Sequence, residues 1–282
     1  MRSLGVIGTL ALDLLREARA RKWVWALALA VTAALLTVAF ALRLDVVDGA
    51  LAASRFFGDS IGRGVYQPVE VFLRPLFEAS AYVVFYGGMI FGIIACADFA
   101  PSLLAPGRIE HLLSLPLRRT ELLAGTYLGV LLLVSFGALY GSVGLTLILG
   151  VKAGVWGLHL ILASLLAILA FAAVYALMLA SAVFVRSAAL SAGAGFLLFV
   201  LGIIATYRAD IARLFEAGLS RQLFTWLTAP LPRIAGLANL AGAIAAEGPV
   251  EQGTLLRLGL GALVFAAAGF ALAAWRFGGK DY

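Results

Sequence analysis

Long apolar runs, each close to twenty residues or more, alternate with short polar breaks along most of this chain. A helix needs about 20 consecutive apolar residues to cross the hydrocarbon layer of a membrane. Six runs meet this length, and we expect them to form spans 1 to 6, at 23–42, 79–97, 122–149, 158–185, 188–206 and 258–275. The pattern therefore predicts an all-α polytopic membrane protein with six transmembrane helices.

Two further segments have helical periodicity without the length of a span. Residues 1–22 combine apolar positions with a basic end, which is typical of an amphipathic helix lying on the membrane surface. Its basic residues follow the first apolar run, so we expect no cleaved signal peptide. Residues 207–257 are interrupted by Pro230 and Pro232, and this pattern favours interfacial or re-entrant helices before span 6. We treat residues 1–282 as a single transmembrane domain, with spans 1 to 5 within 23–206.

Composition agrees with residence in lipid. The chain is 63% hydrophobic and 13% charged, whereas a soluble domain carries roughly 25% charged residues. A net charge of +6 is typical of a membrane protein with basic cytoplasmic loops, so we expect no nucleic acid partner. Cys96 is the single cysteine, which excludes an intramolecular disulfide and a cysteine-based metal cluster.

The distribution of Lys and Arg indicates an orientation. An even number of spans leaves both termini on one side. With the termini in the cytoplasm, the inside segments carry 11 Lys and Arg and the much longer outside segments carry 10. Because basic residues concentrate in cytoplasmic segments, the density predicts that both termini are cytoplasmic, in the cytoplasmic (inner) membrane.

One stretch, GRIEHLLSLPLRRTELLAG at 107–125, breaks the apolar pattern between spans 2 and 3. Its first part has one apolar face and one polar face at helical spacing. The apolar side chains are those of Ile109, Leu112 and Leu113, and the polar ones are those of Arg108, Glu110 and His111. Two interpretations remain open: an amphipathic connector resting on lipid, or a helix whose exposed face docks a soluble partner.

The second part of the stretch ends this helix and starts the next one. Pro116 is expected to stop the helix because it lacks a backbone N–H donor. Arg118 and Arg119 then fall at the level of the lipid headgroups. Thr120 is the expected cap of the following helix, with Glu121 near its positive end.

This stretch resembles the coupling-helix segment of ABC-2 type permeases, the membrane subunits of bacterial ABC exporters. The family pattern has the form G-T-x-E-x-L-L-x-x-P-x-x-R-x-x-[IL]-L-x-G-K. The matching residues are Gly107, Ile109, Glu110, Leu112, Leu113, Pro116, Arg119, Leu122, Leu123 and Gly125. Arg108 stands where the family commonly has Thr, and Thr126 where it has Lys. The number of spans, the amphipathic N-terminal helix and the interrupted segment before span 6 are also similar to the family.

The resemblance implies a function and partners. Two permease copies, or this chain and a paralogue, would pair with two cytoplasmic ATPase subunits and export a substrate or exert force on a periplasmic partner. It implies a cytoplasmic coupling helix with Arg108, Glu110, His111, Arg118 and Arg119 as docking contacts. Ile109, Leu112, Leu113 and Pro116 would anchor that helix. The chain has no G-x-x-x-x-G-K-[ST] loop, so we expect it to bind no cofactor, with ATP and Mg²⁺ on the partner and no enzyme activity of its own.

Other constellations carry weaker signals. Small-residue pairs at Gly88 and Gly92 and at Gly125 and Gly129 allow close helix packing, either within one subunit or at a dimer seam. Spans hold almost no ionisable residues, which argues against an ion-coupled carrier and against a membrane-embedded enzyme. No cluster of residues predicts a catalytic or metal site. The alternative function is a membrane scaffold or a channel-like protein without transport.

Overall fold

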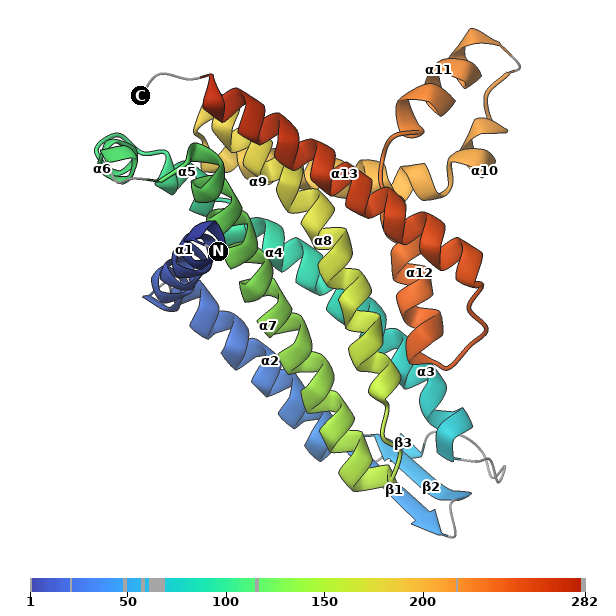
Figure 1. The fold of residues 1–282 in the computed structure, drawn as a ribbon. Coiled ribbons are helices and arrows are strands. Elements are labelled where there is room, and N and C mark those ends of the chain that lie inside the picture. The colour runs from blue at the N-terminus through green and yellow to red at the C-terminus, as the bar shows by residue number, and fades with distance from the viewer. Residues whose placement is uncertain are drawn as a thin grey trace.

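The computed structural model describes residues 2–20, 22–47, 50–56, 59–60, 69–114, 117–216 and 218–279. Within them the chain forms a bundle of long helices with a small sheet at one end (Figure 1). The prediction of a largely helical membrane protein is confirmed. Five described helices are long and apolar enough to cross a membrane, or six if the bent pair α1 and α2 counts as one span.

Predicted spans 2 to 6 lie inside the observed helices. Span 1, predicted at 23–42, corresponds to the helix Lys22–Ala41, and Leu42 begins a strand instead. Spans 4 and 5 have the predicted bounds, in α8 (Leu158–Val185) and α9 (Ala188–Thr206). Spans 2, 3 and 6 extend beyond the apolar run, to Leu73–Leu103, Arg119–Lys152 and Gln252–Gly278. The second span is assembled from four consecutive elements: α3 (Val69–Tyr82), the π-helix η1 (Val83–Gly87), α4 (Gly88–Cys96) and α5 (Phe99–Leu103). Helices outgrow their apolar runs because backbone hydrogen bonding continues through polar residues at the bilayer boundary.

The first two helices meet at an angle. Helix α1 covers Arg2–Ala20 and α2 covers Lys22–Ala41. The turn between them is 74°, and α1 lies across the side of α7 (Arg119–Ala153). The sequence expectation of a separate N-terminal helix before span 1 agrees with this bend.

A three-stranded antiparallel sheet follows α2 and was not predicted. Its strands are β1 (Leu42–Val47), β2 (Ala50–Phe56) and β3 (Asp59–Ser60), in the order β1-β2-β3. The sequence signal for a hairpin was the Asp-Gly pair at 48–49, which lies between two runs with apolar positions. The pair itself is outside the described residues. No secondary structure was predicted for this segment beyond the end of span 1.

Helix α8 is the central element of the bundle. It packs against α7, α9, α12 and α13, and Ala170, Ala173 and Ala176 on it are fully buried. Such small side chains let neighbouring backbones approach closely, which is how helices associate where water supplies no driving force. The Tyr127 hydroxyl of α7 donates a 2.8 Å hydrogen bond to the Ala172 carbonyl, joining α7 to α8.

The segment before the last span forms three short helices. They are α10 (Arg208–Ala212), α11 (Leu219–Thr228) and α12 (Ile234–Ala245), followed by α13 (Gln252–Gly278). With 12 residues and a rise of about 1.5 Å per residue, α12 is about 18 Å long, too short to cross a bilayer. Figure 1 shows α10 and α11 projecting away from the bundle, while α12 lies beside α8.

Candidate functional site

The end of the bundle away from the sheet carries α6 (Arg108–Ser114), the observed counterpart of the predicted docking helix. Gly107 precedes it with φ of +81°, a left-handed conformation that favours glycine. The His111 N–H donates to the Gly107 carbonyl, which starts the helix directly at this bend. The sequence therefore sets α6 at an angle to the preceding helix through one glycine.

The inner face of α6 is anchored in an apolar cluster. Ile109 is only 1% exposed and Leu112 is partly buried against the same cluster. Other members come from four other helices and include Leu104, Leu122, Leu123, Leu179, Val183, Ala273 and Phe277. The Leu113 side chain and Pro116, also predicted as anchors, lie outside the described residues. Because the cluster contains parts of α7, α8 and α13, α6 is packed against three spans.

The outer face of α6 presents side chains to solvent. Glu110 and His111 are exposed, and so is Arg118 in the following turn. Within the described part of the chain, Glu110 and His111 form no side-chain hydrogen bond or ion pair. Glu110 and His111, both predicted as docking residues, are therefore exposed and have no side-chain partner among the described residues.

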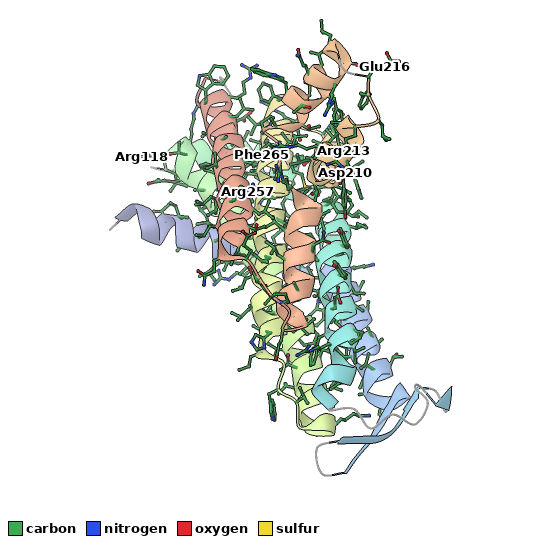
Figure 2. The ribbon with its side chains drawn as sticks, turned by 90° about the vertical axis from the view of Figure 1, so that its right-hand side faces the viewer. Arg118, Asp210, Arg213, Glu216, Arg257 and Phe265 are labelled. Carbon is green, nitrogen blue, oxygen red and sulfur yellow. The ribbon has the colours of Figure 1, made fainter. Side chains whose placement is uncertain are left out.

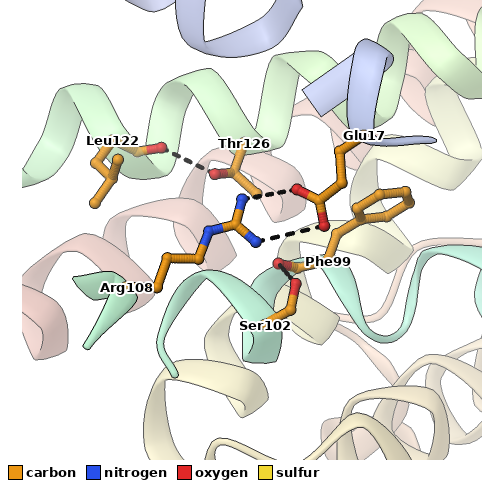
Figure 3. A network of polar contacts seen from close by, with 6 residues as sticks. All are labelled: Glu17, Phe99, Ser102, Arg108, Leu122 and Thr126. Atoms are coloured by element: carbon orange, nitrogen blue, oxygen red, sulfur yellow. Dashed lines mark hydrogen bonds and ion pairs between the residues drawn. The ribbon is translucent and has the colours of Figure 1, made fainter. Parts of the chain in front are cut away.

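Arg108 faces α1 instead. Its guanidinium donates to both Glu17 carboxylate oxygens, at 2.7 Å from Nη2 and 3.4 Å from Nη1 (Figure 3). The hydrogen bond with Glu17 raises the pKa of Arg108, opposed in part by burial. This bidentate pair ties α6 to the last turn of α1. Glu17 was missed by sequence reasoning because 91 residues separate the two partners.

Arg119 joins the start of α7 to the end of the last helix. Its guanidinium donates to the carbonyls of Phe277, at 3.1 Å, and Gly278, at 3.4 Å. It also stands 6.0 Å from the centroid of the Phe277 ring. Carbonyls in the last turn of a helix lack intrahelical partners, so a cation there is stabilising. Arg119 was predicted as a docking contact, and in the structure its guanidinium binds carbonyls within the chain.

The start of α7 differs from the prediction. Thr120 was expected to cap the helix, but this was wrong, because α7 begins one residue before it, at Arg119. Glu121 supplies the cap: its carboxylate accepts a 3.0 Å hydrogen bond from the Arg118 backbone N–H. The expectation that Glu121 lies at the positive end of the helix is confirmed.

The glycine pairs lie at helix contacts of different kinds. A Cβ at Gly125 would lie 2.5 Å from Leu10 Cβ, and one at Gly129 would lie 3.1 Å from Leu14 Cβ, both on α1. A Cβ at Gly92 would meet the Phe171 ring at 2.6 Å, whereas Gly88 has nothing within 4 Å. Gly125 and Gly129 thus let α1 pack closely against α7, and Glu17 of α1 contacts Arg108 of α6.

These features define a class: a helical multi-pass membrane protein that carries a short amphipathic helix at one end of its bundle. No family model matches the chain, and no curated protein is similar to it in sequence. Among the described residues, no group of three or more His, Cys, Asp or Glu side chains is placed to hold a metal ion.

Proposed function

We propose that this chain is the membrane subunit of an ATP-driven ABC-2 type transporter, with α6 as the coupling helix that docks a cytoplasmic ATPase. The observation that carries the proposal is the two-sided character of α6. Its inner face is fixed by Ile109, while Glu110 and His111 stand exposed on the outer face. In such a helix, force applied by a partner to the exposed face is transmitted to the bundle through the buried face.

The contacts around α6 support this mechanical role. Arg108 links α6 to α1 through Glu17, and Arg119 links the start of α7 to the end of α13. Together with the apolar cluster, these links connect α1, α6, α7 and α13 into one packed unit at the α6 end of the bundle. Closure of two ATPase subunits would tilt this unit and bias the bundle between two arrangements, as in rigid-body switching.

The proposal includes six spans, with α2 as the first, both termini in the cytoplasm, and a second copy or paralogue completing the pathway. The start of α1 and the end of α13 lie toward the α6 end of the bundle and away from the sheet (Figure 1), which agrees with an even number of spans. The cargo is exported or, in the second form of the proposal, force is passed to a periplasmic partner through the sheet end. A scaffold or channel-like protein is the alternative.

The test is a co-purification. The chain, tagged at its C-terminus and gently solubilised from its native host, is expected to retain a stoichiometric soluble ATPase. The variant Glu110→Ala with His111→Ala is expected to lose it. A matched control replaces Glu247 and His159, an exposed acid and histidine that contact each other at 2.9 Å between α8 and the segment after α12. Recovery of the chain without ATPase, or equal loss in the control, would favour the scaffold.

A further inference from the structure

Three helices meet at one junction at the base of the projecting α10 and α11. The Gly236 N–H of α12 donates a 3.1 Å hydrogen bond to the Thr206 hydroxyl in the last turn of α9. A Cβ at Gly202 would meet Ile234 at 2.6 Å, and one at Gly236 would meet Leu258 of α13 at 3.1 Å. The end of α9, the start of α12 and the second turn of α13 are therefore packed directly against one another.

An arginine stands next to each of these contact points. Arg208 follows Thr206 by two residues, Arg233 directly precedes Ile234, and Arg257 directly precedes Leu258. Burial lowers the pKa of Arg233, and the nearby positive charges of Arg208 and Arg257 lower it further. Figure 2 shows Arg257 on α13 close to the height of α10, from which Arg208 comes. Three arginines from three elements thus lie at one packed junction, where the charges of Arg208 and Arg257 act on Arg233.

Three acidic residues of this region have partners of their own. Asp210 pairs with Arg213 at 3.6 Å, Glu247 contacts His159, and Glu251 accepts from the Thr254 hydroxyl. Within the described residues, Arg208, Arg233 and Arg257 have neither an ion pair nor a side-chain hydrogen bond. Like charges gathered without a counter-ion repel one another, and beside a membrane-spanning helix the cost is higher than in water. An anion at this point would remove that cost.

The surface beside the arginines is apolar. On α13, Leu256 is 63% exposed and Val264 is 67% exposed, with Leu260 between them. These residues recur at helical spacing and flank Arg257 on a helix long enough to span the bilayer. An anionic headgroup held by the arginines would have its acyl chains along this face.

We propose that Arg208, Arg233 and Arg257 form a binding site for the phosphate of an anionic phospholipid whose chains lie along α13. Guanidinium groups suit a phosphate because they donate paired, charge-assisted hydrogen bonds to its oxygens. A lipid is the occupant rather than a free phosphate because the exposed leucine and valine side chains continue from the basic cluster. The site is independent of the ATPase assignment, and its test uses no nucleotide.

The experiment measures lipid binding to the purified full chain by native mass spectrometry in detergent. Phosphatidylglycerol is compared with phosphatidylcholine. The variant Arg208→Gln with Arg233→Gln is expected to weaken phosphatidylglycerol binding by about tenfold, because charge-assisted hydrogen bonds are lost. Arg213→Gln with Arg221→Gln removes the same charge from the same segment and is expected to bind like the native chain.

Arg257→Gln provides a second variant, because this side chain is exposed and its replacement leaves the packed junction intact. It is also expected to weaken phosphatidylglycerol binding severalfold. Three results would overturn the proposal: equal binding in all variants, equal binding of phosphatidylcholine, or displacement of the lipid by inorganic phosphate at similar concentration. The last result would identify a site for free anions without a lipid contribution.

Discussion

Replacing Gly125 with alanine is expected to push α1 away from α7, because the new methyl group has no room. Its carbon would lie 2.5 Å from the Cβ of Leu10, well inside van der Waals contact. A Cβ atom moves only with its backbone, so the clash cannot be relieved by a rotamer change. Overpacking of this kind costs typically about 1–3 kcal/mol of unfolding free energy.

Gly88→Ala is the matched control, since Gly88 is also a glycine of a spanning helix and has open space around it. Both variants gain whatever helix propensity alanine provides, so the difference between their unfolding free energies isolates the packing cost. The measurement is reversible unfolding in mixed micelles, followed by circular dichroism during titration with dodecyl sulfate.

A double-mutant cycle makes the prediction sharper. Leu10→Gly removes the clashing atom and is expected to offset most of the loss in Gly125→Ala, whereas Leu10→Ala keeps that atom and offers little relief. Equal stability of Gly125→Ala and Gly88→Ala would refute the reasoning. Rescue by Leu10→Ala as complete as that by Leu10→Gly would refute it as well.

Three further predictions concern the α6 end of the bundle. Glu17→Gln is expected to lower the free energy of unfolding by about 0.5–1 kcal/mol, because the pair of Glu17 with Arg108 is partly exposed, and salt should reduce the effect. A double-mutant cycle at Glu17 and Arg108, followed by thermal unfolding, measures this contribution. Arg119→Gln should speed hydrogen exchange and proteolysis in the last turn of α13 by removing the donor to the Phe277 carbonyl; unchanged protection would contradict this. Ile109→Ala should lower the free energy of unfolding by about 2–4 kcal/mol, because the Ile109 side chain is buried. A spectroscopic probe on α6 should then report unfolding of this helix before the rest of the bundle. A single unchanged transition would argue against Ile109 as an anchor.

Much of the architecture follows from local sequence properties. Spans 4 and 5 match the predicted bounds because continuous apolar runs end at strong signals. Helix α8 ends before Arg186, and Ser187 accepts a hydrogen bond from the Leu190 N–H at the start of α9. The amphipathic helix at 108–114 was recognisable because its apolar positions recur at helical spacing between Gly107 and Pro116. These features depend on neighbours a few residues apart, which is the range over which sequence patterns are informative.

The sheet was missed because strand pairing depends on partners elsewhere in the chain, which the pattern within one short segment does not reveal. The pairs Leu42 with Phe56 and Arg43 with Arg55 form only when the chain turns back on itself. The cap of α7 was misplaced for a related reason. A glutamate three residues into a helix can supply the cap that a nearby threonine seems to offer.

The sequence alone determined that this chain belongs in a membrane and where its amphipathic helix lies, because hydrophobicity and helical periodicity are local quantities. Only the tertiary structure decided which charged side chains are held within the chain and which are free for a partner. Arg108 is bound to Glu17 and Arg119 to the Phe277 carbonyl, whereas Glu110 and His111 remain exposed. Arg208, Arg233 and Arg257, spread over 50 residues of chain, become neighbours because three helix ends pack together, and no sequence spacing records that contact.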